Sequence, residues 1–450
     1  EDGFYSVQAR VTDNAGNVSS GVTATITTGA GYPTNVTATA GDKQATISFT
    51  KLPTGITNYT VTAYINGNPV GITATGLKSP IVVSGLTNGT SYTFTVTAIN
   101  RAGNSFVSTP SNAVTPVKQP SAPTILTVNG TAKSTVTSGG RKFVVTARNE
   151  HIFLTVFDAN NSNPQEIPVL VTANYNEGGL IVAMNGFVYL LCVDDTPSMP
   201  GFGTGIVWLI KVDATTLQVV GNYKLSDYGA LLALSCEPTA DILYVGISTG
   251  LDTILQVTAD GATIGNTTDS PGGWGQFTGP IIVSSDGVYV IGYSMQGSAR
   301  NRISAWKYSL DLKTQLLATV PDQYRPFSIS PYLDEPTGAI LDGNTLYIAG
   351  LIDVLSANVQ RVLLHLNAAT LDFVTANDFG EFPIHDCYKN LVGNSGNVYG
   401  LYDGNKLSSI SLDTGIPIWQ ISNISGDYLS FDGNTLLLST GSEVLFYDMI

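Results

Sequence analysis

The sequence is poor in charged residues, and in basic residues above all. Only 12% of its 450 residues are charged, and 34 acidic residues outnumber 20 basic ones, so the formal net charge is −14. This balance argues against nucleic acid and against an anionic membrane surface as partners. No run of 18 apolar residues occurs, so we predict no membrane insertion within this chain. Because the acidic residues are scattered, we interpret them as a source of solubility.

Cysteine is also scarce. The three cysteines, Cys192, Cys236 and Cys387, lie far apart and form no CxxC spacing, so the sequence predicts no zinc site. A disulfide between two of them stays open. With 43% hydrophobic residues and 47 glycines, the chain is nevertheless able to bury a large core.

Histidine occurs at three positions. His151 and His365 fall at or within predicted strands, where we interpret them as packed or surface residues. The third begins the sequence His385-Asp386-Cys387, which holds a base and a nucleophile. Neighbours in an extended strand point to opposite faces, so we predict no catalytic residues there.

Motifs that carry catalytic or cofactor chemistry are missing as well. The chain has no GxSxG, HExxH, P-loop or EF-hand sequence, so we predict a protein that is not an enzyme and has no cofactor. The DGN turns at 342–344 and 432–434 lack the second carboxylate that calcium needs, so we interpret them as hairpin turns. Calcium between the modules stays open, because Asp13 lies near a module end, but nothing else in the sequence supports it.

The sequence does contain repetition, and its first repeat has an offset of 87 residues. Apolar residues from Tyr5 to Val11 alternate with polar ones before the turn Ala15-Gly16-Asn17, and the same pattern precedes the second Ala-Gly-Asn turn at 102–104. The offset is the length of one immunoglobulin-like sandwich. We predict that residues 1–30 are the last hairpin of one module and that 31–116 are a complete second module.

The second module resembles the fibronectin type III family. The resemblance rests on the run GLTNGTSYTFTVTAINRAGNS at 85–105, in which Leu86 and Tyr92 match the tyrosine corner of that family. Phe49 is a departure, because the family usually has Trp there. Residues 1–30 resemble bacterial immunoglobulin-like modules that end in D-x-AGN-x-S. Both resemblances imply spacers and adhesive arms. Residues 117–123, VKQPSAP, are predicted to be a stiff linker.

From residue 124 onward, a turn followed by an apolar strand recurs seven times. The copies are GGRKFVV (139–145), NGFVYLL (185–191), ADILYVG (240–246), DGVYVIG (286–292), DGNTLYI (342–348), SGNVYGL (395–401) and DGNTLLL (432–438). Each is followed by a second strand, and the spacing is that of a four-stranded propeller blade. The fold class predicted for the whole chain is therefore all-β, with immunoglobulin-like and fibronectin type III β-sandwich modules followed by a seven-bladed β-propeller at 124–450.

The strand that follows each copy closes on an acid or its amide. The residues are Asp158, Asp213, Asp260, Asp311, Asn367, Asp413 and Asp448. Such side chains bond the backbone of a following tight turn. Because the last blade lacks a fourth strand, we predict that 124–129 supplies it and closes the ring.

The repeats resemble quinoprotein-like and surface-layer propeller repeats, through their D-G-x-x-Y-V signals and the run SLDTGIPIW at 411–419. We interpret Trp419 in that run as a residue that packs a blade rather than as a quinone contact.

Loops on the propeller are the predicted binding site, because loops carry function on a rigid frame. The candidates lie in three loops within blades, 192–205, 292–302 and 350–361, and in two connections between blades. They are Asp194, Asp195, Phe202, Arg300, Arg302 and Asp353 in the former and Trp274, Tyr324 and Arg325 in the latter. Exposed Trp, Tyr and Arg are common anchors of protein and glycan contacts.

Eight N-x-S/T sequences are acceptor sites for N-glycosylation if the producing organism glycosylates. They are Asn17, Asn35, Asn58, Asn88, Asn129, Asn160, Asn266 and Asn423.

These patterns lead to a functional hypothesis with two alternatives. We expect a non-enzymatic extracellular surface or appendage protein, in which a modular stalk presents a propeller head that binds protein subunits or surface glycans. The first alternative is a structural component of a virus particle or extracellular filament. The second is a secreted propeller enzyme of lyase, glycosidase or quinoprotein type. Since Glu1 begins inside a module, we expect the chain to be part of a longer protein or a larger assembly.

Overall fold

The structure is a computed structural model in which the chain forms strands. It describes residues 3–28, 32–52, 55–100, 105–117, 120, 122–149, 151–162, 164–170, 178–195, 205–237, 239–249, 251–268, 275–277, 279–295, 301–319, 335–352, 358–383, 389–394, 397–402, 406–410, 412, 417–422, 424, 426, 428–432 and 435–448. Among these residues, no helix is long and apolar enough to cross a membrane. The chain divides into two compact units, Glu1–Gln119 and Pro120–Ile450, so the boundary falls inside the segment predicted as a linker.

The N-terminal unit begins with a hairpin. Strand β1 (Gly3–Ala9) pairs antiparallel with β2 (Val22–Thr28). Asp13 shapes the turn between them, because its Oδ1 accepts hydrogen bonds from the backbone N–H groups of Ala15 and Asn17, each at 2.9 Å. The alternation of apolar residues from Tyr5 to Val11 predicts a half-buried strand that includes Val11, and this is wrong for Val11. Val11 lies beyond β1 and is 73% exposed.

Two sheets follow the hairpin. One has the order β3-β4-β7 and the other β6-β5-β8-β9. Their strands are β3 (Thr34–Gly41), β4 (Gln44–Thr50), β5 (Ile56–Ile65), β6 (Asn68–Gly76), β7 (Ile81–Ser84), β8 (Thr93–Asn100) and β9 (Ser105–Val107). Alternating apolar residues on both sheets form one core, so the arrangement is a β-sandwich.

The predicted tyrosine corner is present in this sandwich. Leu86 and Tyr92 are buried, and the Tyr92 hydroxyl accepts a hydrogen bond of 3.1 Å from the backbone N–H of Thr87. Phe49, which stands where the family has Trp, is buried with its ring centroid 4.8 Å from that of Tyr59.

The described residues of the C-terminal unit form six sheets. Their strands, in chain order, are β10 (Thr124–Thr127), β11 (Thr131–Ser138), β12 (Arg141–Arg148), β13 (His151–Phe157), β14 (Gln165–Leu170), β15 (Gly178–Met184), β16 (Phe187–Asp195), β17 (Gly205–Asp213), β18 (Val219–Glu237), β19 (Ile242–Ser248), β20 (Asp252–Thr258), β21 (Thr263–Thr268), β22 (Gly275–Gln276), β23 (Ile281–Ser284), β24 (Gly287–Met295), β25 (Asn301–Tyr308), β26 (Gln315–Thr319), β27 (Glu335–Asp342), β28 (Thr345–Ile352), β29 (Asn358–Asn367), β30 (Phe373–Pro383), β31 (Lys389–Asn394), β32 (Asn397–Tyr402), β33 (Lys406–Ile410), β34 (Pro417–Ser422), β35 (Tyr428–Asp432), β36 (Thr435–Thr440) and β37 (Glu443–Asp448).

These strands make seven groups, which we number in chain order. Groups one, five and six are β11–β14, β27–β30 and β31–β34. Groups two and three, β15–β18 and β18–β21, share the 19-residue strand β18, whose first part pairs with β17 and whose last part pairs with β19. Group four is β22–β26. Group seven is β35–β37 with β10, which pairs antiparallel with β37 from Thr124↔Phe446 to Thr127↔Glu443.

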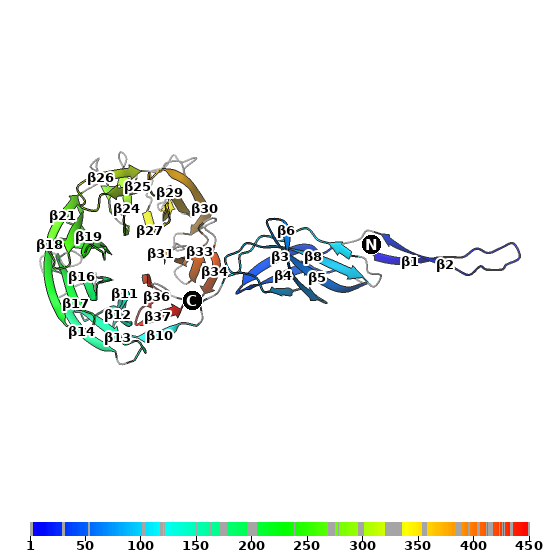
Figure 1. Cartoon of the computed structure of the whole chain (residues 1–450), viewed down its shortest axis with the longest axis horizontal. Helices are drawn as coiled ribbons and strands as arrows, with labels where there is room; N and C mark the ends of the chain where they lie inside the picture. Colours follow the sequence, from blue (N-terminus) through cyan, green and yellow to red (C-terminus); the bar gives the residue numbers. More distant parts are fainter. Residues whose placement is uncertain are drawn as a thin grey trace. The chain divides into compact units, whose positions relative to one another are not determined.

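Successive groups pack against each other. Contacts join β11 to β15, β15 to β18, β18 to β23, β24 to β27, β27 to β31, β31 to β35, and β35 to β11. Figure 1 shows the groups following one another around a circle, in colours from cyan to red. Most boundaries between successive groups hold an apolar cluster, for example Val188 and Leu190 against Val145, because the second strand of each group is buried on both faces.

Candidate functional site

The antiparallel order of the strands gives each C-terminal group two ends of different kinds. At one end, tight turns join the first strand to the second and the third to the fourth, as between β27 and β28 and between β29 and β30. We call this the turn end. At the other end lie the connection from the second strand to the third and the connection to the next group. We call this the loop end.

The strand ends that flank the predicted binding residues all belong to the loop end. They are the ends of β16 and β17, β24 and β25, and β28 and β29 within groups, and those of β21 and β22 and of β26 and β27 between groups. From the sequence alone, the loops within blades and the connections between blades form two separate sets. The order of the strands brings their flanking ends to one side, because alternate connections in an antiparallel sheet share an end.

Three of the predicted binding residues lie in strands, which corrects their assignment to loops. At the end of β16, Asp194 pairs with Ile206 of β17 and Asp195 with Gly205 of β17. Arg302 lies in β25 and pairs with Ser294 of β24. Asp is a poor strand former, so the sequence suggested an early end to β16, but pairing with β17 continues to Asp195. The remaining candidates, Phe202, Trp274, Arg300, Tyr324, Arg325 and Asp353, lie outside the described residues.

The acceptor sites for N-glycosylation are mostly on the described surface. Exposed examples are Asn17, Asn35, Asn129, Asn160 and Asn266, whereas Asn58 and Asn88 are half-buried. Asn88 also bonds two neighbours, since its Oδ1 accepts from the Lys43 N–H and its amide donates to Asp42, both at 2.8 Å. Asn423 lies outside the described residues.

The turn end holds most of the described polar contacts between groups. In five groups a Tyr on the second strand stands directly opposite a polar residue on the third. The pairs are Tyr189 with Lys211, Tyr244 with Gln256, Tyr289 with Lys307, Tyr347 with His365, and Tyr399 with Ser409.

Several of these side chains donate to a backbone carbonyl of the next group, in the turn after its third strand. Tyr244 and Gln256 both donate to the carbonyl of Leu310, at 2.7 and 2.9 Å. From group one, Arg141 reaches the carbonyls of Ala214 and Thr215 in the same way, at 2.7 and 2.6 Å. The recurring contact therefore ties the second and third strands of one group to the turn of its successor.

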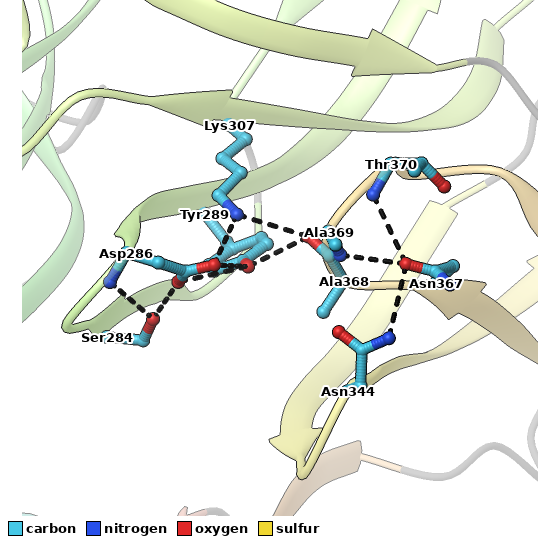
Figure 2. A network of polar contacts seen from close by, with 9 residues as sticks. All are labelled: Ser284, Asp286, Tyr289, Lys307, Asn344, Asn367, Ala368, Ala369 and Thr370. Carbon is cyan, nitrogen blue, oxygen red and sulfur yellow. Dashed lines mark hydrogen bonds and ion pairs between the residues drawn. The ribbon is translucent and has the colours of Figure 1, made fainter.

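Figure 2 shows this contact between groups four and five. The Tyr289 hydroxyl donates to the carbonyl of Ala368 at 2.9 Å, and Lys307 Nζ lies 3.3 Å from the same oxygen. Lys307 also forms an ion pair of 2.6 Å with Asp286, which bonds Ser284. On the far side, Asn367 Oδ1 accepts from the N–H groups of its own turn.

The electrostatics of this cluster favour a structural role. Burial disfavours the charge on Lys307, but Asp286 and Tyr289 outweigh burial and raise the pKa of the ammonium group. Burial also raises the pKa of Tyr289. Lysine and tyrosine nucleophiles need a lowered pKa or an adjacent base that removes the proton. The raised pKa values keep Tyr289 and Lys307 protonated, so we interpret the cluster as a contact between sheets.

Lys211 repeats the arrangement in group two. Its Nζ lies 3.1 Å from Asp260 Oδ1 of group three and 4.3 Å from the centroid of the Phe187 ring. Burial lowers its pKa, but Asp260 and Tyr189 outweigh that effect, so the pKa of Lys211 is raised.

The two described cysteines have raised pKa values, and one described histidine packs against a tyrosine. Cys192 is buried, and burial raises the pKa of its thiol to about 12. Cys236 is half-buried with a raised pKa for the same reason. His365 is buried with its ring centroid 4.8 Å from that of Tyr347. The sequence His385-Asp386-Cys387 lies outside the described residues, within which no cluster of three His, Cys, Asp or Glu that could hold a metal is found.

Comparison with known proteins identifies one module. Residues 31–114 match the family model of the fibronectin type III domain. These residues form the β-sandwich described above, so the N-terminal unit contains a fibronectin type III domain. No curated protein matches the chain.

Proposed function

We propose that residues 124–450 form a seven-bladed β-propeller and that the chain is a non-enzymatic binding protein of an extracellular surface or appendage. Three observations support the propeller. The described strands of this unit make seven groups, six of four strands and one of five, most neighbouring groups share apolar clusters, and contacts between β35 and β11 join the last group to the first. The pairing of β10 with β37 supports closure of the ring by residues 124–129.

The loop end is the proposed binding face. The observation that supports it is that the strands flanking every candidate residue have their nearest ends at the loop end. Several polar side chains of the turn end, among them Tyr289 and Lys307, are engaged in contacts between groups. The fibronectin type III domain supports a role as a spacer and interaction module on which the head is presented. Protein subunits or surface glycans are the proposed partners.

Closure is tested by replacing 124–129 with a flexible Gly-Ser sequence of equal length. Leu126 and Val128 are each only 5% exposed, so their loss should destabilise the C-terminal unit by about 4 kcal/mol. Differential scanning calorimetry measures this loss, with the fibronectin type III domain as an internal reference that should not change. An unchanged melting temperature of the C-terminal unit would contradict closure.

Binding is tested with the full chain on a printed array of mammalian and bacterial glycans and on cells or particles of the producing organism. The variant Asp194→Ala with Arg302→Ala removes one acid and one base from the loop end. Its matched control, Asp372→Ala with Lys313→Ala, removes the same charges from the turn end. Binding lost in the first variant and kept in the second would support the loop end. Equal binding by both would contradict that assignment.

Electron tomography with an antibody against residues 120–450 separates the functional alternatives. Isolated heads on a cell surface support adhesion or receptor binding. Heads in regular contact support a structural subunit of a particle or filament. Unattached protein with lyase, glycosidase or dehydrogenase activity would overturn the non-enzymatic proposal.

A further inference from the structure

Asparagine followed directly by glycine occurs four times in the chain. The positions are Asn66-Gly67, Asn88-Gly89, Asn129-Gly130 and Asn185-Gly186. In such a dipeptide the backbone nitrogen of the glycine is able to attack Cγ of the asparagine side chain and form a succinimide ring. Glycine has no Cβ, so it obstructs this attack least. The reaction needs a free side chain and a free glycine N–H, so the surroundings of each dipeptide decide its rate.

The first dipeptide forms the exposed turn between β5 and β6. Asn66 and Gly67 have φ angles of 48° and 79°, as in a two-residue hairpin turn, and Ile65 pairs with Asn68 across it. A Cβ placed on Gly67 would meet no atom within 4 Å. Among the residues that the structure describes, none bonds the Asn66 side chain or the Gly67 N–H. Asn68 reaches only the backbone carbonyl of Asn66, at 3.4 Å.

The second dipeptide is held at both reacting groups. Asn88 Oδ1 accepts a hydrogen bond from the Lys43 N–H, and the Asn88 amide donates to Asp42, both at 2.8 Å. The N–H of Gly89, which would attack, donates to the carbonyl of Pro116 at 2.9 Å. Ring closure at Asn88 therefore requires that these three hydrogen bonds break first.

The other two dipeptides are each held in one respect. The side-chain amide of Asn185 donates to Asp241. The Asn129 side chain is exposed, but Gly130 lies so close to β12 that a Cβ there would stand 2.7 Å from the carbonyl oxygen of Ala147. The backbone at Asn129 thus has little room for the rotation that brings the nitrogen to the side chain.

We propose that Asn66 is a deamidation site of the folded chain and reacts ahead of the other three Asn-Gly positions. Attack by the Gly67 nitrogen forms the bond to Cγ and breaks the bond from Cγ to Nδ2, and the side-chain nitrogen leaves as ammonia with the Gly67 proton. Water then opens the succinimide at either carbonyl, which yields aspartate or isoaspartate. Exposed turns open locally at small cost, and Asn66 needs no more than such an opening.

The product changes the charge of the turn and, as isoaspartate, the path of the backbone. Each event adds one negative charge. Isoaspartate carries the main chain through its side-chain carbons, so one atom is added to the turn. Because the turn sets the register of a hairpin, the pairing of β5 with β6 should weaken. The inference concerns the fibronectin type III domain alone and is independent of the proposed binding face.

Peptide mapping by mass spectrometry tests the proposal on the full chain, which is incubated at mildly alkaline pH and sampled over time. The mass gained when OH replaces NH2 gives a rate at each position, and chromatography separates aspartate from isoaspartate peptides. Asn66 should react about tenfold or more faster than Asn88, since Asn88 must first lose its hydrogen bonds. In concentrated urea the four rates should converge, because the dipeptide is the same at each position.

A folded chain in which another Asn-Gly position reacts as fast as Asn66, or in which Asn66 stays unmodified, would overturn the proposal. Two variants test its physical basis. Asp42→Ala removes the acceptor of the Asn88 amide, so it should speed the reaction at Asn88 and leave the rate at Asn66 unchanged. Asn66→Gln would need a larger ring and should lose the reaction at that turn. An unchanged rate at Asn88 in the folded Asp42→Ala variant would contradict protection by hydrogen bonds.

Discussion

At the turn end of the C-terminal groups, side chains bond backbone carbonyls of the neighbouring group, and the connections are short. At the loop end, strands such as β16 and β24 finish in longer connections, and the described candidates Asp194, Asp195 and Arg302 lie at strand ends there. The same polar residue types serve different purposes at the two ends. Tyr289 and Lys307 hold two groups together, whereas Asp194 and Arg302 stand at the edge of the proposed binding face.

This difference predicts that the contacts that stabilise the unit and the proposed binding residues lie at opposite ends of the groups. If the turn end carries stability, substitutions there should lower the free energy of unfolding and leave binding intact. Substitutions at the loop end should do the reverse. The following predictions test this separation.

Removal of a buried tyrosine at the turn end should have the largest effect. Tyr289 is fully buried, so Tyr289→Ala should lower the free energy of unfolding by about 3–5 kcal/mol through lost burial and a cavity. Urea denaturation measures the change. The control Tyr228→Ala, at a residue 44% exposed, should cost far less, and similar losses in both variants would break the comparison.

The shared carbonyl of Ala368 predicts coupling between its two donors. Tyr289→Phe and Lys307→Met each leave one donor in place, so each should cost about 1 kcal/mol. The double variant leaves that carbonyl without either donor and should cost more than the two single losses together. A double-mutant cycle in urea measures the coupling, and strict additivity would show that the donors act independently.

The turn after β29 should depend on Asn367. Its Oδ1 accepts from the N–H groups of Ala369 and Thr370, at 2.9 and 3.2 Å. Asn367→Ala should therefore cost about 1 kcal/mol, as the loss of similar caps does. Asn367→Asp keeps the acceptor and serves as the matched control. Thermal melts of both variants measure the effect, and a loss in the Asp variant as large as in the Ala variant would argue against this role.

The ion pair between Lys307 and Asp286 predicts a small dependence on pH. Burial raises the pKa of Asp286, but Lys307 outweighs burial and holds it below its ordinary value of 3.8. A lowered carboxyl pKa gives stability that is present above pH 3.8 and is lost as the pH falls through the folded pKa. The raised pKa of Lys307 gives stability that is lost only above pH 10.5.

The stability difference between the original chain and Lys307→Met should thus stay constant from about pH 5 to about pH 9 and shrink below pH 3.8. Asp286 is 54% exposed, so solvent screening keeps the titrating part under about 1 kcal/mol. Urea denaturation across this range measures it. A difference that grows toward acid pH would contradict the assigned ion pair.

The loop end should show the smallest change in stability. Asp194→Ala with Arg302→Ala should alter the free energy of unfolding by about 0.5 kcal/mol or less, because both residues lie at strand ends. Calorimetry measures this value in the same preparation used for binding. A loss comparable to that of Tyr289→Ala would show that the loop end also carries stability.

Local order was largely predictable from the sequence. The Asp342-Gly343-Asn344 turn signal stands where β27 ends and β28 begins, because glycine at a positive φ of 55° suits the turn. The predicted bonds from closing Asp and Asn residues to their turns occur at Asp158, Asp213, Asp311 and Asn367. Asp260 differs, because it forms an ion pair with Lys211.

Contacts between groups were not predicted. Tyr recurs at the third position of the second strand, but its acceptor is a backbone carbonyl, which no residue type marks in the sequence. The β-bulges near the start of several fourth strands were not predicted either, as at Leu316, which is left between the paired residues Gln315 and Leu317. A bulge adds one residue to one strand, and no residue type marks it in the sequence. The continuity of β18 was hidden because Ser226, Asp227 and Tyr228 resemble a loop.

The continuous strand β18 has a mechanical consequence. Groups two and three are joined by an unbroken backbone that is hydrogen-bonded to β17 along its first part and to β19 along its last. When tension is applied to the chain, the other groups can separate at the segments that connect them. Groups two and three can separate only if the hydrogen bonds of β18 to both β17 and β19 break. In an optical trap, we expect groups two and three to unfold together, and the extension released in that step should be about twice that of a single group.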